Sequence, residues 1–310
     1  MTTRTLSIVV PVYFNAESLP ELFAELTDLE RELAQREFAL ELIFVDDGSK
    51  DDSLQELLKL KKKRPATKVI SLSRNFGAVA ASKTGLSFVS GDVFTILAAD
   101  LQDPPQQILP MLEQWSKGHK FVVSARASRG DPPLTRLFAR AYYQLVKRLV
   151  VKNYPKGGYD LMLMDKCMLP YMAGSTKNTN PNLYALWLGF EPAILYYERR
   201  KRRHGKSQWT FRKRLKFLVD TMTGFSVTPI RLLSAFGVVV AMLSFLYGCS
   251  VVISALFGTV EVAGFATLAA LISFFGGLIL VMLGGIAEYV WRVFVTVNNH
   301  PETVIDQTFL

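Results

Sequence analysis

Continuous apolar runs alternate with amphipathic segments over the first hundred residues. The runs that predict buried strands lie at residues 6–13, 42–45, 68–72 and 93–97. The segments between them are rich in Leu and Glu or in Ala and predict helices at about 17–37, at 53–63 and after residue 77. Strands that are apolar on both faces and alternate with helices are typical of a parallel sheet covered on both sides. The pattern therefore predicts an α/β domain that binds its ligand at the carboxyl ends of the strands.

Two long uncharged runs follow, at Leu232–Val260 and Val262–Ala287. Each exceeds the ~20 residues that a helix needs to cross a bilayer, and only Glu261 separates them. A pair of buried helices in a soluble domain would give an implausibly apolar core, so the runs predict a transmembrane hairpin. Lys and Arg are concentrated before the first run, and Arg292 follows the second. The positive-inside rule then predicts a multi-pass protein of the inner (cytoplasmic) membrane, with the globular domain and both termini in the cytoplasm.

A strongly basic segment precedes the hairpin. Residues 199–216 contain ten basic and no acidic residues. A nucleic-acid patch is the alternative, but the position directly before a membrane helix favours anionic membrane lipids and no nucleic acid. Apolar residues at spacings of three and four then predict one face of a helix in the bilayer interface: Phe211, Leu215, Leu218, Met222 and Phe225. The predicted parts are a globular domain at 1–210, an amphipathic helix at 211–228, transmembrane helices at 229–260 and 262–291, and a cytoplasmic tail at 292–310.

The charge distribution follows the same division. The chain has a formal net charge of +9, and half of its residues are hydrophobic. Residues 1–231 hold 35 of the 36 Lys and Arg and 23 of the 27 Asp and Glu, a local net charge of +12. Cys167 and Cys249 are the only cysteines, which excludes a disulfide framework and a zinc cluster. The glycine pairs Gly276-Gly277 and Gly284-Gly285 allow close helix packing, so a homo-oligomer is compatible with the sequence.

Polar residues follow each predicted strand of the globular domain. They are Pro11 and Tyr13, Asp46 and Asp47, Arg74 and Asn75, and Asp100 and Gln102. Such residues also make ordinary turns, but carboxyl ends of parallel strands meet at one edge, so we expect a shared site. The chain has neither a G-x-G-x-x-G fingerprint nor a P-loop. A carboxylate at Asp100 suits a divalent cation that carries the phosphates of a nucleotide, although Ala98 stands where a two-carboxylate version of this turn would have a second acid.

Four segments together resemble family 2 glycosyltransferases with the GT-A fold, a Rossmann-like and mostly parallel sheet. They are Val9-Val10-Pro11-Val12-Tyr13, Val45-Asp46-Asp47-Gly48-Ser49, Asn75-Phe76-Gly77 and Ala99-Asp100-Leu101-Gln102-Asp103-Pro104-Pro105. The chain is most similar to polyprenyl-phosphate glycosyltransferases, including dolichyl-phosphate mannose synthases and bactoprenol glucosyltransferases. The resemblance covers nearly the whole chain, because the bacterial members also end in two membrane helices.

The resemblance implies a nucleotide-sugar donor and a metal cofactor. Asp100 would hold Mg²⁺ or Mn²⁺ on the pyrophosphate, with Gln102 beside the donor or acceptor phosphate. Arg202, Gly205, Ser207 and Trp209 are similar to the family's R-x-x-G-x-S-x-W loop over the pyrophosphate, with Gln208 where Lys is common. The residues expected to bind the nucleotide-sugar are Pro11, Tyr13, Glu17, Asp46, Asp47, Arg74, Asp100, Arg202 and Ser207. The chain departs from the family at Ala98, where an Asp is frequent, and at Phe14-Asn15, where Asn-Glu is frequent.

A second group of residues is expected to bind the acceptor phosphate. These residues are Arg126, Ser128, Arg129 and Arg136, since arginine supplies paired N–H donors with fixed geometry; a solvated basic helix is the alternative. Asp160 follows Gly157-Gly158-Tyr159 and matches an acidic residue that acts at the acceptor in bacterial relatives. A loop turn is the alternative for Asp160. The catalytic residues expected from the resemblance are Asp160, Asp100 and Gln102, and positioning suits Asp160 better than proton removal because a lipid phosphate is already largely ionised.

The chain is therefore expected to be a hexosyltransferase of the membrane. It would transfer one sugar, with inversion, from a UDP- or GDP-sugar to polyprenyl (undecaprenyl) phosphate at the cytoplasmic face, for cell-envelope glycans or glycoprotein modification. One alternative is a processive polysaccharide synthase, which usually carries Q-x-x-R-W and more membrane helices. The other is a catalytically inactive membrane scaffold that binds nucleotide-sugar, which Ala98 favours and the retained Asp100, Gln102 and Asp160 oppose.

Overall fold

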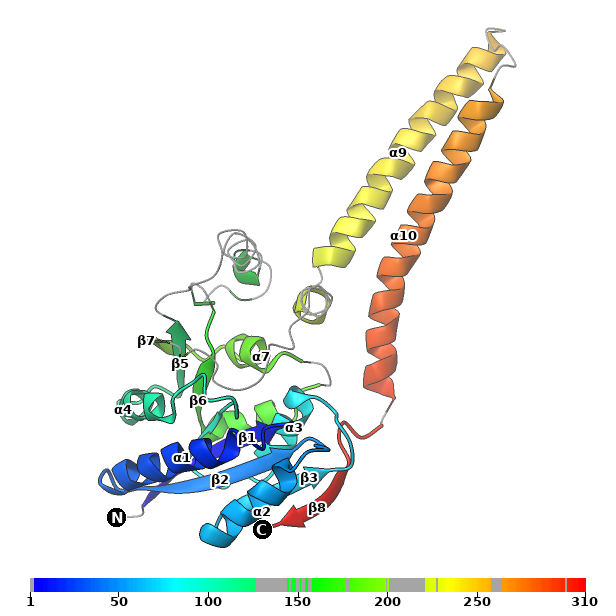
Figure 1. Ribbon diagram of the computed structural model, residues 1–310. Coiled ribbons are helices and arrows are strands. Elements are labelled where there is room, and N and C mark those ends of the chain that lie inside the picture. Colours follow the sequence, from blue (N-terminus) through cyan, green and yellow to red (C-terminus); the bar gives the residue numbers. More distant parts are fainter. Residues whose placement is uncertain are drawn as a thin grey trace. The chain divides into compact units, whose positions relative to one another are not determined.

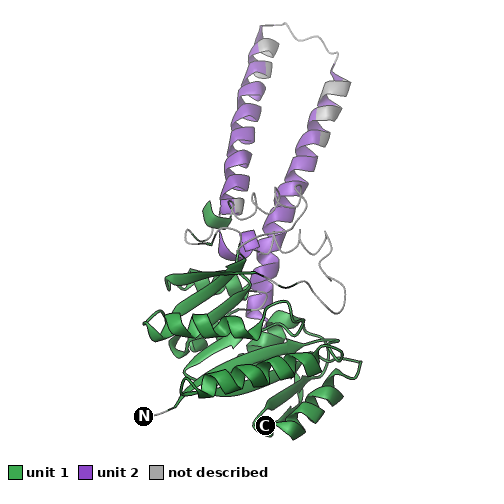
Figure 2. Ribbon diagram, turned by 60° about the vertical axis from the view of Figure 1, so that its left-hand side comes forward, with its two compact units in different colours: residues 1–215, 300–310 green, residues 216–299 purple. Residues whose placement is uncertain are grey.

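The computed structural model (Figure 1) describes residues 3–126, 144, 146–148, 151, 154–155, 158–176, 179–198, 200, 221–226, 228–257, 264–298 and 300–310. The chain divides into two compact units, shown in Figure 2. Unit 1 consists of Met1–Leu215 and His300–Leu310, and unit 2 consists of Lys216–Asn299. The residues that close the chain thus belong to the same unit as those that open it.

An eight-stranded sheet forms the centre of unit 1 in the described part of the chain. Its strands are β1 (Arg4–Val12), β2 (Phe38–Asp46), β3 (Lys68–Leu72), β4 (Val93–Ile96), β5 (Phe121–Arg126), β6 (Leu161–Asp165), β7 (Pro192–Tyr197) and β8 (Ile305–Phe309). Their order is β7-β5-β6-β4-β1-β2-β3-β8. The four strands predicted from the apolar runs are neighbours and parallel, which confirms the predicted α/β class. The sheet as a whole is mixed, because β6 pairs antiparallel with β4 and β5, and β8 pairs antiparallel with β3.

Helices cover both faces of this sheet, and the alternation of side chains along the strands explains why. The helices of unit 1 are α1 (Leu19–Ala34), α2 (Ser53–Lys63), α3 (Ala78–Leu86), α4 (Ile108–Ser116), α6 (Leu169–Ala173) and α7 (Pro181–Trp187), with short 3₁₀ turns η1 (Pro105–Gln107) and η2 (Lys166–Met168). Ile8 and Val10 of β1 point into the core cluster that α1 and α4 close, while Val9 points into the cluster that α3 closes. Leucines of α1 at spacings of three and four are fully buried, as an amphipathic helix requires.

The apolar runs predicted four strands and did not predict β5, β6, β7 or β8. The last of these, β8, lacks the pattern expected of a strand. Its residues are mostly exposed, so the segment lacks the apolar alternation that predicts a strand. It forms because β3 has a free edge, and Ile70 of β3 pairs with Thr308 of β8. Because β8 belongs to unit 1, the chain leaves this unit before unit 2 and returns to it afterwards.

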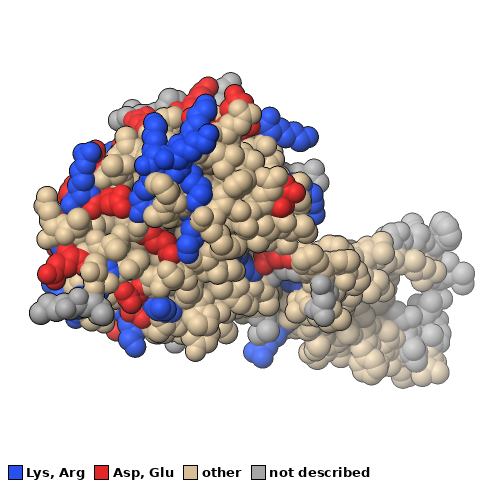
Figure 3. Space-filling model, turned by 90° about the horizontal axis from the view of Figure 1, so that it is seen from below, with Lys and Arg blue, Asp and Glu red and all other residues tan. Residues whose placement is uncertain are grey.

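Unit 2 contains the two long apolar helices, α9 (Thr228–Leu256) and α10 (Phe265–Val297). Ile230–Ser250 and Phe274–Val297 are long and apolar enough to cross a membrane, by length and composition. Large apolar side chains on both helices are exposed, including Phe245 at 70% and Leu280 at 71%. Figure 3 shows charged side chains of both signs over unit 1 and a largely uncharged surface on these helices. Exposed apolar surface of this extent is typical of membrane association.

The predicted amphipathic helix at 211–228 is described only in part. Residues 211–220 and 227 lie outside the described residues, and residues 221–225 are helical.

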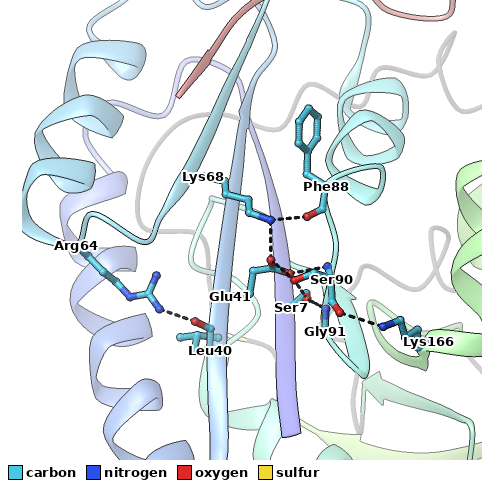
Figure 4. Close-up of polar contacts among 9 residues, drawn as sticks. All are labelled: Ser7, Leu40, Glu41, Arg64, Lys68, Phe88, Ser90, Gly91 and Lys166. Carbon is cyan, nitrogen blue, oxygen red and sulfur yellow. Dashed lines mark hydrogen bonds and ion pairs between the residues drawn. The ribbon is translucent and has the colours of Figure 1, made fainter. Parts of the chain in front are cut away.

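A polar cluster ties the strands together away from their carboxyl ends (Figure 4). The Glu41 carboxylate, in β2, accepts hydrogen bonds from Ser7 of β1, from Lys68 Nζ of β3 at 2.8 Å, and from Ser90 N and Oγ before β4 at 2.9 and 2.7 Å. Burial alone would raise the Glu41 pKa, but the hydrogen bonds from these partners outweigh burial and lower the pKa to about 2. The cluster therefore stabilises the alignment of all four parallel strands.

We expect the Glu41→Gln substitution to lower the free energy of unfolding by about 3 kcal/mol at pH 7, the equivalent of the pKa shift. A folded-state pKa below the unfolded value gives stability that is complete above about pH 4.5 and is lost as the pH falls toward 2. The difference between wild type and variant should accordingly shrink at pH 3. Guanidinium titration of the full-length protein in detergent, followed by tryptophan fluorescence, measures both values.

Glu191→Gln is the matched control, because Glu191 is exposed before β7 and should change stability by less than about 0.5 kcal/mol. Equal effects of the two substitutions at pH 7 would contradict a stabilising role of the Glu41 cluster.

Candidate functional site

The carboxyl ends of β1, β2, β3 and β4 lie at one edge of the sheet, as the sequence predicts. Main-chain hydrogen bonds align these ends: Asp47 N donates to Val12 O at 2.8 Å, and Leu97 N donates to Val9 O at 2.9 Å. Ser18 Oγ, at the start of α1, donates to Ala99 O at 2.8 Å and so joins the β1–α1 loop to the Asp100 turn. The structure thus brings the strand-end residues expected to share a site to that edge: Pro11, Tyr13, Asp46, Asp47, Arg74, Asp100 and Gln102.

Asp47 organises the loop that follows the neighbouring strand. Its two carboxylate oxygens accept hydrogen bonds from Phe76 N at 2.8 Å and Gly77 N at 2.9 Å. Burial raises the Asp47 pKa, while the two main-chain donors oppose that shift. Both oxygens of Asp47 therefore hold the β3–α3 loop against the end of β2, which fixes Arg74 beside the site.

Asp46 lies beside Asp47 but has a different environment. Its side chain is buried at 1% exposure, and Oδ2 accepts a hydrogen bond from Ser49 N at 3.3 Å. Oδ1 is buried and has no hydrogen-bond partner among the described residues. Burial raises the Asp46 pKa despite the hydrogen bonds from Ser49. A buried acceptor left unpaired costs about 1–3 kcal/mol, so a ligand that donates an N–H or O–H to this oxygen recovers that free energy.

Gly48 permits the close approach of the two loops. Its φ is +65°, and a Cβ at this position would lie 2.5 Å from the Arg74 carbonyl carbon and 2.6 Å from Arg74 Cα. Both its conformation and the space around it therefore require glycine. The sequence motif Asp-Asp-Gly-Ser is more than a turn here, because Asp47 and Gly48 both contact the β3–α3 loop.

The β1–α1 loop presents two aromatic rings at this edge. Tyr13 and Phe14 are exposed at 38% and 47%, and their ring centroids lie 4.4 Å apart. Phe14 has φ +54°, and its N–H donates to Ser49 Oγ at 3.2 Å. Asn15, which departs from the family pattern, accepts a hydrogen bond from Tyr13 N at 3.0 Å and stabilises the loop. Glu17 follows in the same loop and is exposed.

The Asp100 turn has a strained backbone that its core contact maintains. Leu101 has φ +59°, a conformation that is unfavourable for a branched side chain, but its side chain is 1% exposed and belongs to the core. Gln102 N donates to Asp100 Oδ1 at 3.3 Å. Burial of Leu101 thus holds Asp100 and Gln102, both half-buried, on the opposite side of the turn, while Ala98 is exposed.

The ends of β5, β6 and β7 form a second part of the site. Arg126 donates from Nε and Nη2 to the two carboxylate oxygens of Asp160, at 2.6 and 2.8 Å. This pairing raises the Arg126 pKa, against the opposing effect of burial. The Tyr197 hydroxyl lies 3.4 Å from Asp160 Oδ2 and also donates to the Asp103 carboxylate. Asp103 and Tyr197 thus connect the turn at residues 100–105 with Asp160 and Arg126, the two residues expected at the acceptor.

Sequence reasoning did not assign a role to Asp103 or Tyr197. Both are buried, at 4% and 6% exposure, and Tyr197 is opposite Arg126 in the β5–β7 pairing. Asp103 belongs to the recognised Q-D-P-P segment and could have been noted there. Tyr197 has no local signal, because its role depends on a pairing between strands about seventy residues apart.

Five of the expected site residues lie outside the described residues. They are Ser128, Arg129, Arg136, Arg202 and Ser207.

The described residues fit a metal ion that takes most of its ligands from a substrate. No group of three His, Cys, Asp or Glu side chains among them is placed to hold a metal ion. Mg²⁺ typically binds one or two carboxylates, keeps several waters and takes phosphate oxygens from the substrate. A single carboxylate at Asp100 is compatible with that coordination, and Ala98 leaves no second acid two residues earlier.

Comparison with known proteins places the chain among sugar-transfer enzymes. The family model described as Glycosyl transferase family 2 matches residues 7–177. An uncharacterized glycosyltransferase of Synechocystis sp. is 31% identical over 302 residues, covering 96% of this chain and 94% of that protein. The SfII prophage-derived bactoprenol glucosyl transferase of Shigella flexneri is 30% identical over 305 residues, covering 98% of each. A crystal structure of glucosyl-3-phosphoglycerate synthase from Mycobacterium tuberculosis is 18% identical, with a TM-score of 0.47, over 71% of this chain and 78% of that one.

We expect Gly48→Ala to release the β3–α3 loop from Asp47. The added Cβ would meet the Arg74 main chain at 2.5 Å and require a positive φ, so the loop must shift. Hydrogen–deuterium exchange of peptides covering Phe76 and Gly77 should become faster by at least about fivefold, equivalent to about 1 kcal/mol of local stability. Gly118→Ala is the control, because Gly118 also has a positive φ but an added methyl group there would have nothing within 4 Å. Unchanged exchange in Gly48→Ala would contradict the packing of this loop on Gly48.

Proposed function

We propose that this chain, which belongs to glycosyl transferase family 2 and has the GT-A fold, transfers a single sugar from a UDP- or GDP-sugar to polyprenyl phosphate at the cytoplasmic membrane face. The bactoprenol glucosyl transferase of Shigella flexneri, similar over 98% of both chains, supports the lipid acceptor. The residues of the site edge support the donor and the chemistry.

One observation carries the donor assignment: Asp46 Oδ1 is buried and without a partner among the described residues. Uracil and guanine both present a ring N–H that can donate to such a carboxylate, and burial strengthens that hydrogen bond. Asp47 is the weaker candidate for this role, because both of its oxygens already accept hydrogen bonds, from Phe76 N and Gly77 N. The exposed ring of Tyr13 offers an apolar face for the base beside Asp46.

The Asp100 turn would hold the donor pyrophosphate through a divalent cation, Mg²⁺ or Mn²⁺. When bound, such an ion neutralises the negative charge that develops on the departing nucleoside diphosphate. Asp100 supplies the protein carboxylate, and the strained Leu101 conformation fixes its direction. Arg74, whose guanidinium lies 4.1 Å from the Phe76 ring centroid, adds positive charge at the same edge.

Arg126 and Asp160 would position the acceptor phosphate. An oxygen of the lipid phosphate forms the new bond to the anomeric carbon as the bond from that carbon to the nucleoside diphosphate breaks, which inverts the configuration. The acceptor needs no base, since a phosphate monoester is largely ionised near neutral pH. Both Asp160 oxygens accept from Arg126, so we assign Asp160 the role of orienting Arg126 toward the phosphate.

The connectivity of the chain supports a hairpin in the membrane. Unit 1 contains both Met1–Leu215 and, after the two helices, His300–Leu310, whose strand β8 pairs with β3. Two crossings return the chain to its starting side, and the excess of Lys and Arg before α9 favours the cytoplasm for that side. The polyprenyl tail would remain in the bilayer while its phosphate reaches Arg126.

Ala98 favours one alternative, an inactive scaffold that binds nucleotide-sugar without transferring it. An assay of the purified full-length protein separates the two functions. It contains undecaprenyl phosphate, Mg²⁺ or Mn²⁺, and a panel of UDP- and GDP-sugars. We expect a lipid-linked sugar from at least one donor; nucleotide binding without any product would support the scaffold instead.

We expect Asp100→Asn to reduce metal-dependent turnover at least about 100-fold, because the site loses the carboxylate proposed to hold the cation, an effect comparable with loss of a major electrostatic contact. Asp28→Asn is the control, since Asp28 is exposed on α1 and pairs with Arg31. Initial rates over a titration of Mn²⁺ provide the measurement. Turnover by Asp100→Asn that equals wild type at every metal concentration would rule out Asp100 as the metal ligand.

We expect Arg126→Lys to raise the KM for undecaprenyl phosphate about 10-fold to 100-fold. Lysine lacks the planar guanidinium that pairs with both Asp160 oxygens and keeps further N–H donors for the phosphate, and a hydrogen bond to a charged group contributes about 1.5–3 kcal/mol. The KM for the nucleotide-sugar should stay within about twofold. Arg31→Lys is the control, because the Arg31 side chain is exposed on α1. A rise in the nucleotide-sugar KM alone would place Arg126 at the donor and contradict the assignment.

A further inference from the structure

The chain segment that follows unit 2 contacts the start of the β3–α3 loop and, beyond that loop, the C-terminal part of α3. Before the loop, Ser73 N donates to Val304 O at 3.0 Å, next to the irregular end of the β3–β8 pairing. After the loop, Thr84 on α3 shares a hydrogen bond of 2.7 Å with Thr303. The contacts come from consecutive residues of the C-terminal segment. Val304 and Thr303 make these two hydrogen bonds, and Glu302 forms an ion pair with Lys83.

Lys83 of α3 forms the strongest of these contacts. Its side chain is only 9% exposed, and its ammonium group donates to the Glu302 carboxylate and to Ser175 O, the latter at 2.5 Å. A buried ammonium group without an acceptor is costly, and removing one partner of a buried pair is strongly destabilising locally. The Lys83 ammonium group therefore needs the Glu302 carboxylate as an acceptor, and this ion pair fixes the position of α3.

The loop between these two attachments is the one that Asp47 binds. Phe76 N and Gly77 N donate to Asp47, and the Arg74 main chain lies against Gly48. A displacement of α3 or of Ser73 must move these donors. Such a movement would also displace Asp46, because Asp46 is adjacent to Asp47 and carries the buried oxygen without a partner among the described residues.

We propose that residues 300–304 are a working part of the nucleotide site and that Glu302 is a positioning residue for it, acting through Lys83 and the β3–α3 loop. This inference rests on the proposed donor function of Asp46 and Asp47. It extends the site beyond residues 7–177, which the family model matches, to a segment that the chain reaches only after the two apolar helices.

The test measures UDP and GDP binding by calorimetry with Mn²⁺, using the full-length protein in detergent. We expect Glu302→Gln to weaken binding of the nucleotide, UDP or GDP, that the wild type binds. The Kd should rise by about 5-fold to 30-fold, which corresponds to about one or two kcal/mol. The KM for the nucleotide-sugar should rise by a similar factor, and the KM for undecaprenyl phosphate should not change. Asp306→Asn is the matched control, since it makes the same charge change on an exposed residue of β8.

A double-mutant cycle tests the route through Lys83. If Glu302 acts through Lys83, the Lys83→Met/Glu302→Gln protein should bind nucleotide as weakly as Lys83→Met alone, because neighbouring partners are not additive. Thr303→Val gives a second variant that retains the ion pair and should weaken nucleotide binding in the same direction.

The outcomes separate the two proposals. A wild-type protein that binds neither UDP nor GDP overturns the donor function and this inference with it. Nucleotide binding by wild type with equal affinity in Glu302→Gln overturns the positioning role alone. A lower melting temperature of Glu302→Gln with unchanged nucleotide affinity also overturns that role, because it would show that Glu302 contributes only to stability.

Discussion

The site depends on the division of roles between two adjacent carboxylates at the end of β2. Both oxygens of Asp47 accept hydrogen bonds from the main chain of the next loop, at 2.8 and 2.9 Å, whereas Asp46 keeps a buried oxygen without a partner among the described residues. The Asp47 carboxylate therefore holds the loop in place, and the Asp46 carboxylate is available to a ligand. This difference follows from register, because consecutive residues at a strand end point to opposite sides. Gly48 makes the arrangement possible by letting Arg74 approach the turn.

The second part of the site, at the ends of β5, β6 and β7, follows a related principle, in which a charged group is oriented by partners that are themselves buried. Arg126 is held by both oxygens of Asp160, and Tyr197 connects Asp160 with Asp103. Asp103 lies three residues after Asp100, so the same turn takes part in both halves of the site. Networks of this kind are rigid because each buried member needs its partner. In the proposed mechanism, this turn would connect the residues at the departing phosphate with those at the attacking phosphate.

The fold was largely predictable where the signal is local. Runs of apolar residues identify the four parallel strands and the two long apolar helices, because burial on both faces or exposure to lipid demands apolar side chains at every position. Strand β8 was not predictable, since an edge strand with exposed side chains forms only when a partner edge exists. The strand-end residues Asp46 and Asp100 could be placed at one edge from parallel topology, but Tyr197 and the pairing of Glu302 with Lys83 could not.

The sequence by itself determined the α/β class, the resemblance to family 2 glycosyltransferases and the candidate carboxylates, because periodicity and short motifs are properties of neighbouring residues. Only the tertiary structure decided which carboxylate is free for a ligand, which side chains orient Arg126, and that the last residues of the chain return to the sheet. Each of these depends on contacts between segments far apart in sequence. The residue that a buried polar atom meets is fixed by packing, and packing is set by the whole fold.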